Sequence, residues 1–392
     1  GLGHATRVIE VCRELLCVED ASVEVVVVST LPTHIFESAF SSHPRRNLFE
    51  YRKLEKALDC GGIQADAFKV KPLETLETYY AIAGEEERRK TIFKEEVEWL
   101  LSRNIHFVCS DTVPVACRSA KLASIPSAVV SNLSWDHIYA HFLDDVSTDS
   151  EVKMYADMIG TITEDYKCAE FLLRLPGSHP MPAYDGGGGG GANCIQSSEV
   201  LDMPFVVRKA RKTKEDVRRE LGINEDTKLL LLMFGGLSGD VSWKLDNESL
   251  PDKWVCAVCS AIWPTCLDGD GDGGGGRRGD GNFLRLDRDV YLPDIIEASD
   301  VVLGKIGYGS VSECICHRTP LIYVPRKNFA EEKYLKALLS KFNTCTEMSS
   351  EDFRSGKWKE AIKEADRLEP NFEGNANGGF ECAKTILRLV RK

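Results

Sequence analysis

The stretch LGKIGYGSVSE, residues 303–313, decides which fold this sequence can adopt. The apolar run before it predicts a strand that ends at Gly304, and the pattern after its glycines predicts a helix that begins near Ser310. A second apolar run, PLIYVP, follows that helix. Strand, helix and strand in this order indicate a parallel sheet, and such sheets bind ligands where a strand ends and the next helix begins.

The turn inside this stretch has the composition of an anion-binding site. Gly307 and Gly309 allow the backbone to approach a ligand closely, and the first N–H groups of the helix have no partner within it. Lys305 adds a positive charge. The turn is not a Walker loop, because its lysine precedes the glycines and Ile306 stands where a Ser or Thr would bind magnesium. The expected ligand is a diphosphate held by Ser310 and its neighbours.

Glu313 lies one turn further along the predicted helix, where a carboxylate cannot favour phosphate. A carboxylate can accept hydrogen bonds from two neighbouring hydroxyls at once, as on a ribose. A diphosphate and a ribose together indicate a nucleotide. The alternative is a glutamate that is solvated on the surface of the helix.

Two other glycine-rich turns are candidate ligand sites. In GLGHATR, at the start of the sequence, Gly1 and Gly3 would bring the backbone close to a ligand. His4 is a candidate general base, because an unperturbed imidazole titrates near about 6.5, but it also fits a histidine that caps a helix. In LLLLMFGGLSGD, Gly235 and Gly236 end an apolar strand and are typical of a phosphate-facing nest, although they also fit an ordinary turn.

The α/β pattern occurs twice along the 392 residues, which indicates two domains. The apolar runs are nearly continuous, as expected of strands that are buried on both faces. In the first half, the expected strands are 23–29, 105–111, 126–132 and 171–175, and the expected helices are 5–17, 91–102, 115–123 and 152–166. In the second half, the strand-like runs are KLLLLMFGG, WVCAVCS, DVVLGK and PLIYVP.

We therefore expect an α/β fold with a first domain over residues 1–205 and a second over 206–375. A last helix, within 376–392, is expected to pack back on the first domain. Six consecutive glycines lie shortly before the boundary, and flexible glycine runs cannot support a packed core. The Asp- and Gly-rich stretch at 267–282 lacks the spacing of a calcium loop and is expected to be a surface insertion.

Composition argues against several classes of protein. The formal net charge of -12 and the lack of a long basic run argue against nucleic-acid binding. No apolar run reaches the roughly 18 residues of a membrane span, and no signal-peptide pattern stands at the start, which predicts a cytosolic protein. Most of the 14 cysteines lie in apolar runs, as expected for buried thiols in a reducing compartment. The CxxC pair, Cys256 and Cys259, lacks a second pair at finger spacing, so no metal site is expected.

Eight stretches, in the same order from the start to nearly the end, carry a resemblance to a known family. They are GHATRVIEV, LDCGGIQADAF, EVEWL, SDTVPVACRSA, SNLSWDHIYA, RLPGSHPMPA, LGKIGYGSVSE and EPNFEGNANGG. The sequence resembles the GT-B glycosyltransferases, including the lipid-linked N-acetylglucosaminyltransferase of peptidoglycan synthesis, and more closely the N-terminal glycosyltransferase-like region of plant L-arabinokinases. The resemblance implies two Rossmann-like domains whose parallel sheets face each other across a cleft.

The resemblance also implies a nucleotide-sugar donor, expected to be UDP-linked. Glu313 would bind the ribose hydroxyls, Lys305 and the glycine-rich turn would bind the diphosphate, and the backbone of Leu292 would read the base. Glu331 and Glu332 fall where paired glutamines of the bacterial enzyme meet the donor sugar. Because these two residues are acids here, the sugar preference of that enzyme is not carried over.

Across the cleft, the resemblance places Gly3 and His4 opposite the donor phosphates and the acceptor. Asp111, which ends a first-domain strand, and Asp136, in NLSWDHI, are further candidates near the acceptor, although either also fits a turn or capping residue. The implied reaction is inverting transfer, in which an acceptor hydroxyl, deprotonated by His4 or a neighbouring Asp, attacks the anomeric carbon. No metal ion is expected, because the helix and the lysine take its place.

The sequence departs from the family pattern at both ends. No strand precedes the first turn, which predicts a gap in the first sheet and a fragment of a longer protein. No sugar-kinase region of the GHMP superfamily follows, so arabinose phosphorylation is not expected from these residues. Three functions stay open: a glycosyltransferase with an unknown acceptor, a non-catalytic nucleotide-sugar-binding regulatory region, and a piece of a longer kinase whose kinase domain would be its partner.

Overall fold

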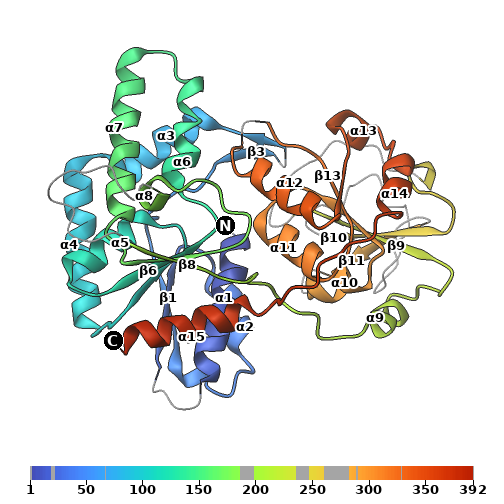
Figure 1. Cartoon of the computed structure of the whole chain (residues 1–392), viewed down its shortest axis with the longest axis horizontal. Helices are drawn as coiled ribbons and strands as arrows, with labels where there is room; N and C mark the ends of the chain where they lie inside the picture. The colour runs from blue at the N-terminus through green and yellow to red at the C-terminus, as the bar shows by residue number, and fades with distance from the viewer. Residues whose placement is uncertain are drawn as a thin grey trace, which may run out of the picture.

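The computed structural model describes residues 2–18, 23–66, 68–185, 198–234, 247–259, 282–287, 290–327 and 329–391. Gly1, Gly235 and Gly236, for which the sequence predicted ligand contacts, lie outside these ranges, as do the six consecutive glycines and residues 267–281 of the Asp- and Gly-rich stretch. The first half of the chain forms one α/β lobe and the second half forms another beside it (Figure 1).

The first domain is built around parallel strands. Its helices are α1 (Leu2–Cys17), α2 (Thr33–Phe40), α3 (Pro72–Tyr79), α4 (Glu86–Ser102), α5 (Pro114–Leu122), α6 (Trp135–Ala140), α7 (Asp149–Tyr166) and α8 (Pro182–Asp185). Its strands are β1 (Val25–Ser29), β2 (Phe49–Lys53), β3 (Gln64–Asp66), β4 (Lys69–Val70), β5 (Val108–Ser110), β6 (Ser127–Ser131), β7 (Phe171–Arg174) and β8 (Glu199–Asp202). Strands β5 to β8 form one parallel sheet, β1 and β2 a separate parallel pair, and β3 and β4 an antiparallel hairpin.

The register of β5 and β6 places two polar residues side by side. Asp111 directly follows β5 and Asn132 directly follows β6, and the two strands are parallel, so both residues lie at the same edge of the sheet. Helix α1 lies over this edge, because its Arg7 contacts both side chains. The edge of the first sheet and the start of α1 therefore meet at one point.

The second domain is a six-stranded parallel sheet in the order β11-β10-β9-β12-β13-β14. Its strands are β9 (Lys228–Met233), β10 (Trp254–Cys259), β11 (Phe283–Leu286), β12 (Val301–Gly304), β13 (Leu321–Tyr323) and β14 (Cys345–Glu347). Its helices are α9 (Lys214–Glu220), α10 (Leu292–Ala298), α11 (Tyr308–Cys316), α12 (Glu332–Lys341), α13 (Ser350–Arg354) and α14 (Lys359–Ala365). Gly304 ends the buried strand β12 beside Met233 of β9, where a Cβ would lie 2.2 Å from the Met233 carbonyl oxygen. This close approach requires glycine.

The last helix, α15 (Gly378–Val390), returns to the first domain and lies along α1 (Figure 1). The Gly378 N–H donates a hydrogen bond of 2.9 Å to the Phe205 carbonyl, just before the second domain. Ala5 of α1 and Cys382 of α15 belong to one buried cluster, which continues to Val311 of α11. The hydrophobic core therefore runs across the domain boundary.

Most expected elements are present, with shifted ends. The structure begins α1 at Leu2 rather than at residue 5, so Gly3 and His4 lie inside its first turn; the Thr6 hydroxyl already bonds the Gly3 carbonyl one turn back. Helix α4 begins at Glu86 rather than at residue 91. Its first residues are charged and show no apolar periodicity, so the sequence pattern did not reveal them, but acidic side chains in a first turn stabilise the N-terminus of a helix. Thr213 caps α9, since its hydroxyl accepts a hydrogen bond from the Asp216 N–H.

Candidate functional site

A small pocket lies between the two domains where α1 meets α11. Its first-domain side is Gly3, Thr6, Arg7 and Glu10; its other residues are Val206, Val207, Arg208, Tyr308, Gly309, Ser312 and Glu313. The structure thus brings residues of the first turn of the chain together with the glycine-rich helix, more than 300 residues later. Gly3, Gly309 and Glu313 are the residues of this pocket for which the sequence predicted ligand contacts, and Gly3 lies inside α1 rather than in a turn before it.

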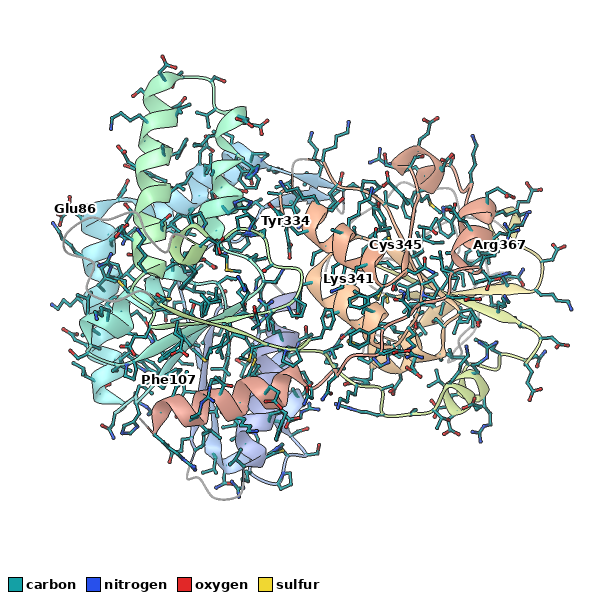
Figure 2. All side chains as sticks on the ribbon, in the orientation of Figure 1. Glu86, Phe107, Tyr334, Lys341, Cys345 and Arg367 are labelled. Carbon is teal, nitrogen blue, oxygen red and sulfur yellow. The ribbon has the colours of Figure 1, made fainter. Side chains whose placement is uncertain are left out.

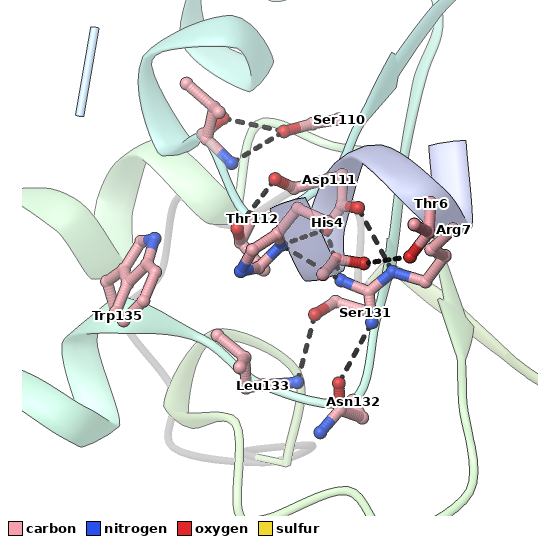
Figure 3. Close-up of polar contacts among 12 residues, drawn as sticks. His4, Thr6, Arg7, Ser110, Asp111, Thr112, Ser131, Asn132, Leu133 and Trp135 are labelled. Carbon is pink, nitrogen blue, oxygen red and sulfur yellow. Dashed lines mark hydrogen bonds and ion pairs between the residues drawn. The ribbon is translucent and has the colours of Figure 1, made fainter. Parts of the chain in front are cut away.

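His4 and Asp111 form a pair at the first-domain edge of this region (Figure 3). His4 Nδ1 lies 2.9 Å from Asp111 Oδ1, and the side chains are 32% and 11% exposed. In the tautomer with the proton on Nδ1, the ring donates to the carboxylate and Nε2 keeps a free lone pair. Such a pair orients an imidazole as a general base.

Arg7 connects this pair to the rest of the site (Figure 3). Its Nε donates to Asp111 Oδ2 at 3.0 Å, its Nη2 bonds Asp111 Oδ1, and its Nη1 donates to Asn132 Oδ1 at 3.0 Å. Arg7 Nη2 also lies 3.3 Å from His4 Nδ1. Burial opposes ionisation of Asp111, but the adjacent charges and hydrogen bonds of Arg7 and His4 outweigh it and hold the pKa of Asp111 well below its ordinary value. Asp111 is therefore a fixed anion.

The backbone at Asp111 carries a sign of a constrained turn. Thr112, the next residue, has a φ of 67° and is 2% exposed. A β-branched residue in this left-handed region costs on the order of 1–3 kcal/mol, and such residues cluster at functional sites. The Tyr166 hydroxyl donates to the Thr112 carbonyl at 2.6 Å and helps to hold the turn. The carboxylate of Asp111 is held by its hydrogen bonds to Arg7 and His4, at the start of this strained turn.

Two contacts carry this network into the second domain. Asn132 Nδ2 donates to Glu331 Oε1 at 2.9 Å, and the Arg7 guanidinium lies 5.1 Å from the centre of the Tyr308 ring, in the first turn of α11. Glu331 is 5% exposed. The predicted general base is therefore connected through Arg7 and Asn132 to a residue predicted to meet the donor sugar.

Lys305 lies at the turn between β12 and α11, as predicted, and contacts the first domain. Its Nζ donates to Gln64 Oε1, in the β3–β4 hairpin, at 3.3 Å. Burial, helped by the nearby Arg326 and opposed by Glu331 and Glu332, lowers the pKa of Lys305 to about 8. A partly neutralised, buried lysine beside a glycine-rich turn suits an anionic ligand, which would restore its full charge.

The other predicted acids of the second domain have arginine partners. Glu313 accepts two hydrogen bonds from Arg208, from Nε at 2.7 Å and Nη2 at 3.2 Å, and is 5% exposed. Glu332 accepts the Arg326 N–H at 2.9 Å and Nε at 3.0 Å, while Arg326 Nη2 bonds the Ile306 carbonyl. Glu313 is thus a buried ion-pair residue on the pocket wall, and not a glutamate solvated on the helix surface.

The remaining predicted residues take different places. Gly309 and Ser310 lie in the first turn of α11 and Gly307 is its N-cap, while Leu292 is the first residue of α10. Asp136 is 1% exposed in the first turn of α6, where it accepts hydrogen bonds from Ser134, Thr163 and the His137 N–H. Within the described part of the chain it bonds neither His4 nor Asp111, so its contacts fit the capping alternative.

Sequence reasoning missed Arg7, Asn132, Arg208, Gln64 and Arg326. Each contacts a predicted site residue, but each lies in a stretch that reads as ordinary helix, loop or linker. Three of them lie within the motifs that carry the family resemblance, and this was the signal available: Arg7 in GHATRVIEV, Gln64 in LDCGGIQADAF and Asn132 in SNLSWDHIYA.

The residues that the structure describes contain neither a cluster of metal ligands nor a helix that could span a membrane. Among them, no group of three or more His, Cys, Asp or Glu side chains is placed to hold a metal ion. The helices that the structure describes include none with the length and apolar character to cross a bilayer. Cys256 and Cys259 lie in β10 as free thiols.

Comparisons by sequence give relatives but no family model, since none matches this sequence. The chain is 41% identical over 388 residues to the L-arabinokinase of Arabidopsis thaliana, an alignment that covers 99% of this chain and 33% of that protein. It is 27% identical over 227 residues to an uncharacterized glycosyltransferase of Methanopyrus kandleri, covering 57% of this chain and 58% of the relative. The chain therefore spans a third to somewhat more than half of the length of these relatives.

Comparisons by structure define the fold. A UDP-glucosyltransferase of Polygonum tinctorium superimposes with a TM-score of 0.59 at 14% identity, covering 100% of this chain and 91% of that one. A UGT of Arabidopsis thaliana complexed with UDP-L-rhamnose gives a TM-score of 0.58 at 14% identity, covering 99% and 96%. The molecule has the GT-B fold of glycosyltransferases, and nearly its whole length is similar to one third of an L-arabinokinase.

Proposed function

We propose that this protein binds a nucleotide-diphosphate sugar between its two domains and transfers the sugar, with inversion, to a hydroxyl acceptor. The observation that carries the proposal is that the His4–Asp111 pair contacts Arg7, which lines the interdomain pocket opposite the start of α11. Lys305 lies at the turn just before α11 and contacts the first domain through Gln64. A base on one domain and an anion site on the other are what a displacement at an anomeric carbon requires. Structural neighbours solved with UDP-sugars favour a UDP-linked donor.

In the proposed reaction, His4 Nε2 takes the proton from the acceptor hydroxyl while its Nδ1–H is held by Asp111. The acceptor oxygen forms a bond to the anomeric carbon, and the bond from that carbon to the diphosphate oxygen breaks. Lys305 and the first N–H groups of α11 stabilise the charge on the departing nucleoside diphosphate, without a metal ion. Glu313 would exchange Arg208 for the ribose hydroxyls.

Transfer and donor hydrolysis by the full chain, measured with a panel of UDP- and GDP-sugars, test this function. We expect His4→Ala to lower the rate by at least about 10²-fold, because it removes the general base, and to leave nucleotide affinity within about twofold. The exposed His34 in α2 provides the control, and His34→Ala should change neither value. Equal rates for the His4 variant and the unaltered protein would contradict the role of His4.

A second function, a nucleotide-sugar-binding regulatory region of an L-arabinokinase-like sugar kinase, is favoured by two observations. The chain matches only 33% of the L-arabinokinase, and Arg7 already neutralises both oxygens of Asp111. This function predicts nucleotide-sugar binding without hydrolysis or transfer, lost in Glu313→Ala and unchanged in His4→Ala. The same panel therefore separates the two functions.

A further inference from the structure

We propose that Gln64, on the β3–β4 hairpin of the first domain, is a donor-binding residue that completes the diphosphate site of the second domain. This inference rests on the proposed function. The side-chain amide of Gln64 donates hydrogen bonds to the diphosphate oxygens of the donor, next to Lys305.

The hairpin is fixed to the second domain although it belongs to the first in sequence. Phe68, between its two strands, is 7% exposed, and its ring centre lies 5.3 Å from those of both Phe234 and Phe353. Phe234 directly follows β9, at the edge of the sheet where the ligand is expected. Lys69 of β4 also forms a parallel bridge with Lys327. The anchor thus holds Gln64 at the ligand edge.

A second aromatic side chain makes the reciprocal contact. Phe329, in the loop before α12, packs against the buried cluster of the first domain and lies beside Gly62, where a Cβ would be 3.3 Å from its ring. Arg326 stacks on the same ring at 4.3 Å. Phe68 of the first domain is buried in the core of the second, and Phe329 of the second domain packs against the core of the first. The segment before the hairpin therefore has little freedom to move away from the site.

The hydrogen bonding of Gln64 leaves the two N–H donors of its amide without a partner among the described residues. Its Oε1 accepts from Lys305 at 3.3 Å, and within the described residues its amide nitrogen, with two N–H groups, has no protein acceptor. The three arginines of the site each hold a carboxylate of the protein, namely Asp111, Glu313 and Glu332. Lys305, by contrast, has an uncharged partner. A neutral amide orients the ammonium group without cancelling its charge, so both groups remain available to an anion.

The charges around Lys305 give the proposal a pH signature. Arg326 lowers the pKa of Lys305 in addition to burial, whereas Glu331 and Glu332 raise it. With the pKa at about 8, the ammonium loses its proton between about pH 7 and 9, and the affinity for a diphosphate should fall over that range. A glutamate in place of Gln64 would hold the proton on Lys305 and move this fall to higher pH.

Calorimetric titration of the full chain with UDP, at pH 7 and pH 9, tests the inference. We expect Gln64→Glu to weaken binding about tenfold or more at pH 7, because it introduces repulsion, and to reduce the difference between the two pH values. Gln64→Ala should weaken binding several-fold. Ala65→Glu adds the same charge to the next residue, which is exposed and makes no contact with Lys305 among the described hydrogen bonds, and should change the affinity less than twofold.

The outcomes separate this inference from the proposed function. If UDP binding is lost in Lys305→Ala but both Gln64 variants bind as tightly as the unaltered protein, or more tightly, Gln64 is not a donor ligand. If the unaltered protein binds neither UDP nor GDP, the proposed function itself is wrong and the inference falls with it. Thermal midpoints within about 2 °C of each other would show that the Gln64 variants are folded.

Discussion

One residue, Arg7, decides the electrostatics of the candidate base. It is 5% exposed and supplies the positive charge for a buried carboxylate, Asp111, to which it is bonded through two nitrogens. Removing one partner of a buried ion pair leaves the other charge uncompensated, which costs about 3–5 kcal/mol. The pair is therefore required for the stability of the folded site as well as for its geometry.

We predict that Arg7→Met lowers the free energy of unfolding by about 3 kcal/mol at pH 7, measured by urea denaturation. The folded pKa of Asp111 is depressed, so its pairing stabilises the protein above the unfolded pKa, near about 4, and that stabilisation is lost as the pH falls below it. The difference between variant and unaltered protein should therefore shrink on acidification below pH 4. Arg88→Met, at an exposed position of α4, should have no effect at either pH.

At this scale the sequence predicted types of residue better than their partners. Residue types next to glycine-rich turns singled out His4, Lys305 and Glu313, and their catalytic and binding roles stay predictions. Their partners could not be predicted, because they are distant in the sequence and a local pattern does not show which distant residues come into contact. Arg7 and Asp111 are 104 residues apart, and Lys305 and Gln64 are 241 apart. A carboxylate that pairs with arginine reads, in sequence, like one that is free to bind a sugar.

At the scale of elements, the packing of α15 rests on glycine at its first position. A Cβ on Gly378 would lie 2.3 Å from the Pro204 carbonyl oxygen and 2.5 Å from Phe205 backbone atoms. These atoms belong to the connection between the two domains and not to a flexible side chain. Any side chain at this position must therefore displace α15 or the connection.

We predict that Gly378→Ala lowers the free energy of unfolding by about 1–3 kcal/mol, the usual cost of overpacking. Gly160, inside α7, is the matched control, because a Cβ there meets nothing within 4 Å. Gly160→Ala should stabilise the protein by up to about 1 kcal/mol, since alanine favours a helix interior. Thermal denaturation of both variants, with midpoints that move in opposite directions, checks the prediction; a Gly378 variant as stable as the unaltered protein would contradict the packing of α15.

Elements with continuous apolar character were predictable, and short polar ones were not. Strands β6, β9, β12 and β13 are almost wholly buried, and their sequences are apolar apart from the serines at both ends of β6 and the exposed lysine that begins β9. The hairpin of β3 and β4 escaped prediction, because QAD and KV are too short to show a period and its anchor, Phe68, is a single apolar residue. Strand β3 and Phe68 lie within the motif LDCGGIQADAF, but the sequence does not show that this segment packs against the second domain.

At the scale of the whole molecule, repetition of the α/β pattern predicted two parallel sheets, but nothing in it predicted the contacts between the domains. One such contact is a group of imidazoles beside α12. The ring of His179 stacks on that of His137, with the ring centres 4.4 Å apart. Tyr334 lies on α12 of the second domain (Figure 2), and its ring centre is 5.9 Å from that of His179. These aromatic rings lie where the first domain meets α12, and burial there favours the uncharged form of both imidazoles.

Acid should therefore weaken the molecule at this boundary before it affects the carboxylates. Burial, assisted by neighbouring positive groups including Lys333, lowers the pKa of His137 and of His179 to about 4. Unfolded histidines titrate near about 6.5, so between these values the unfolded chain binds protons that the folded protein does not, and stability falls as the pH drops through that window. For the more buried His179 the loss between pH 7 and 4.5 is about 2 kcal/mol.

We predict that His179→Gln makes the unfolding free energy less dependent on pH between 7 and 4.5, measured by urea denaturation at several pH values. Glutamine removes the titration but offers an oxygen that can accept the Ser134 N–H, which His179 Nε2 now accepts at 3.2 Å. The variant should lose about 2 kcal/mol less than the unaltered protein on acidification. His34→Gln, at an exposed site in α2, should keep the full pH dependence. An unchanged slope in the His179 variant would mean that the boundary between the domains does not respond to acid through this ring.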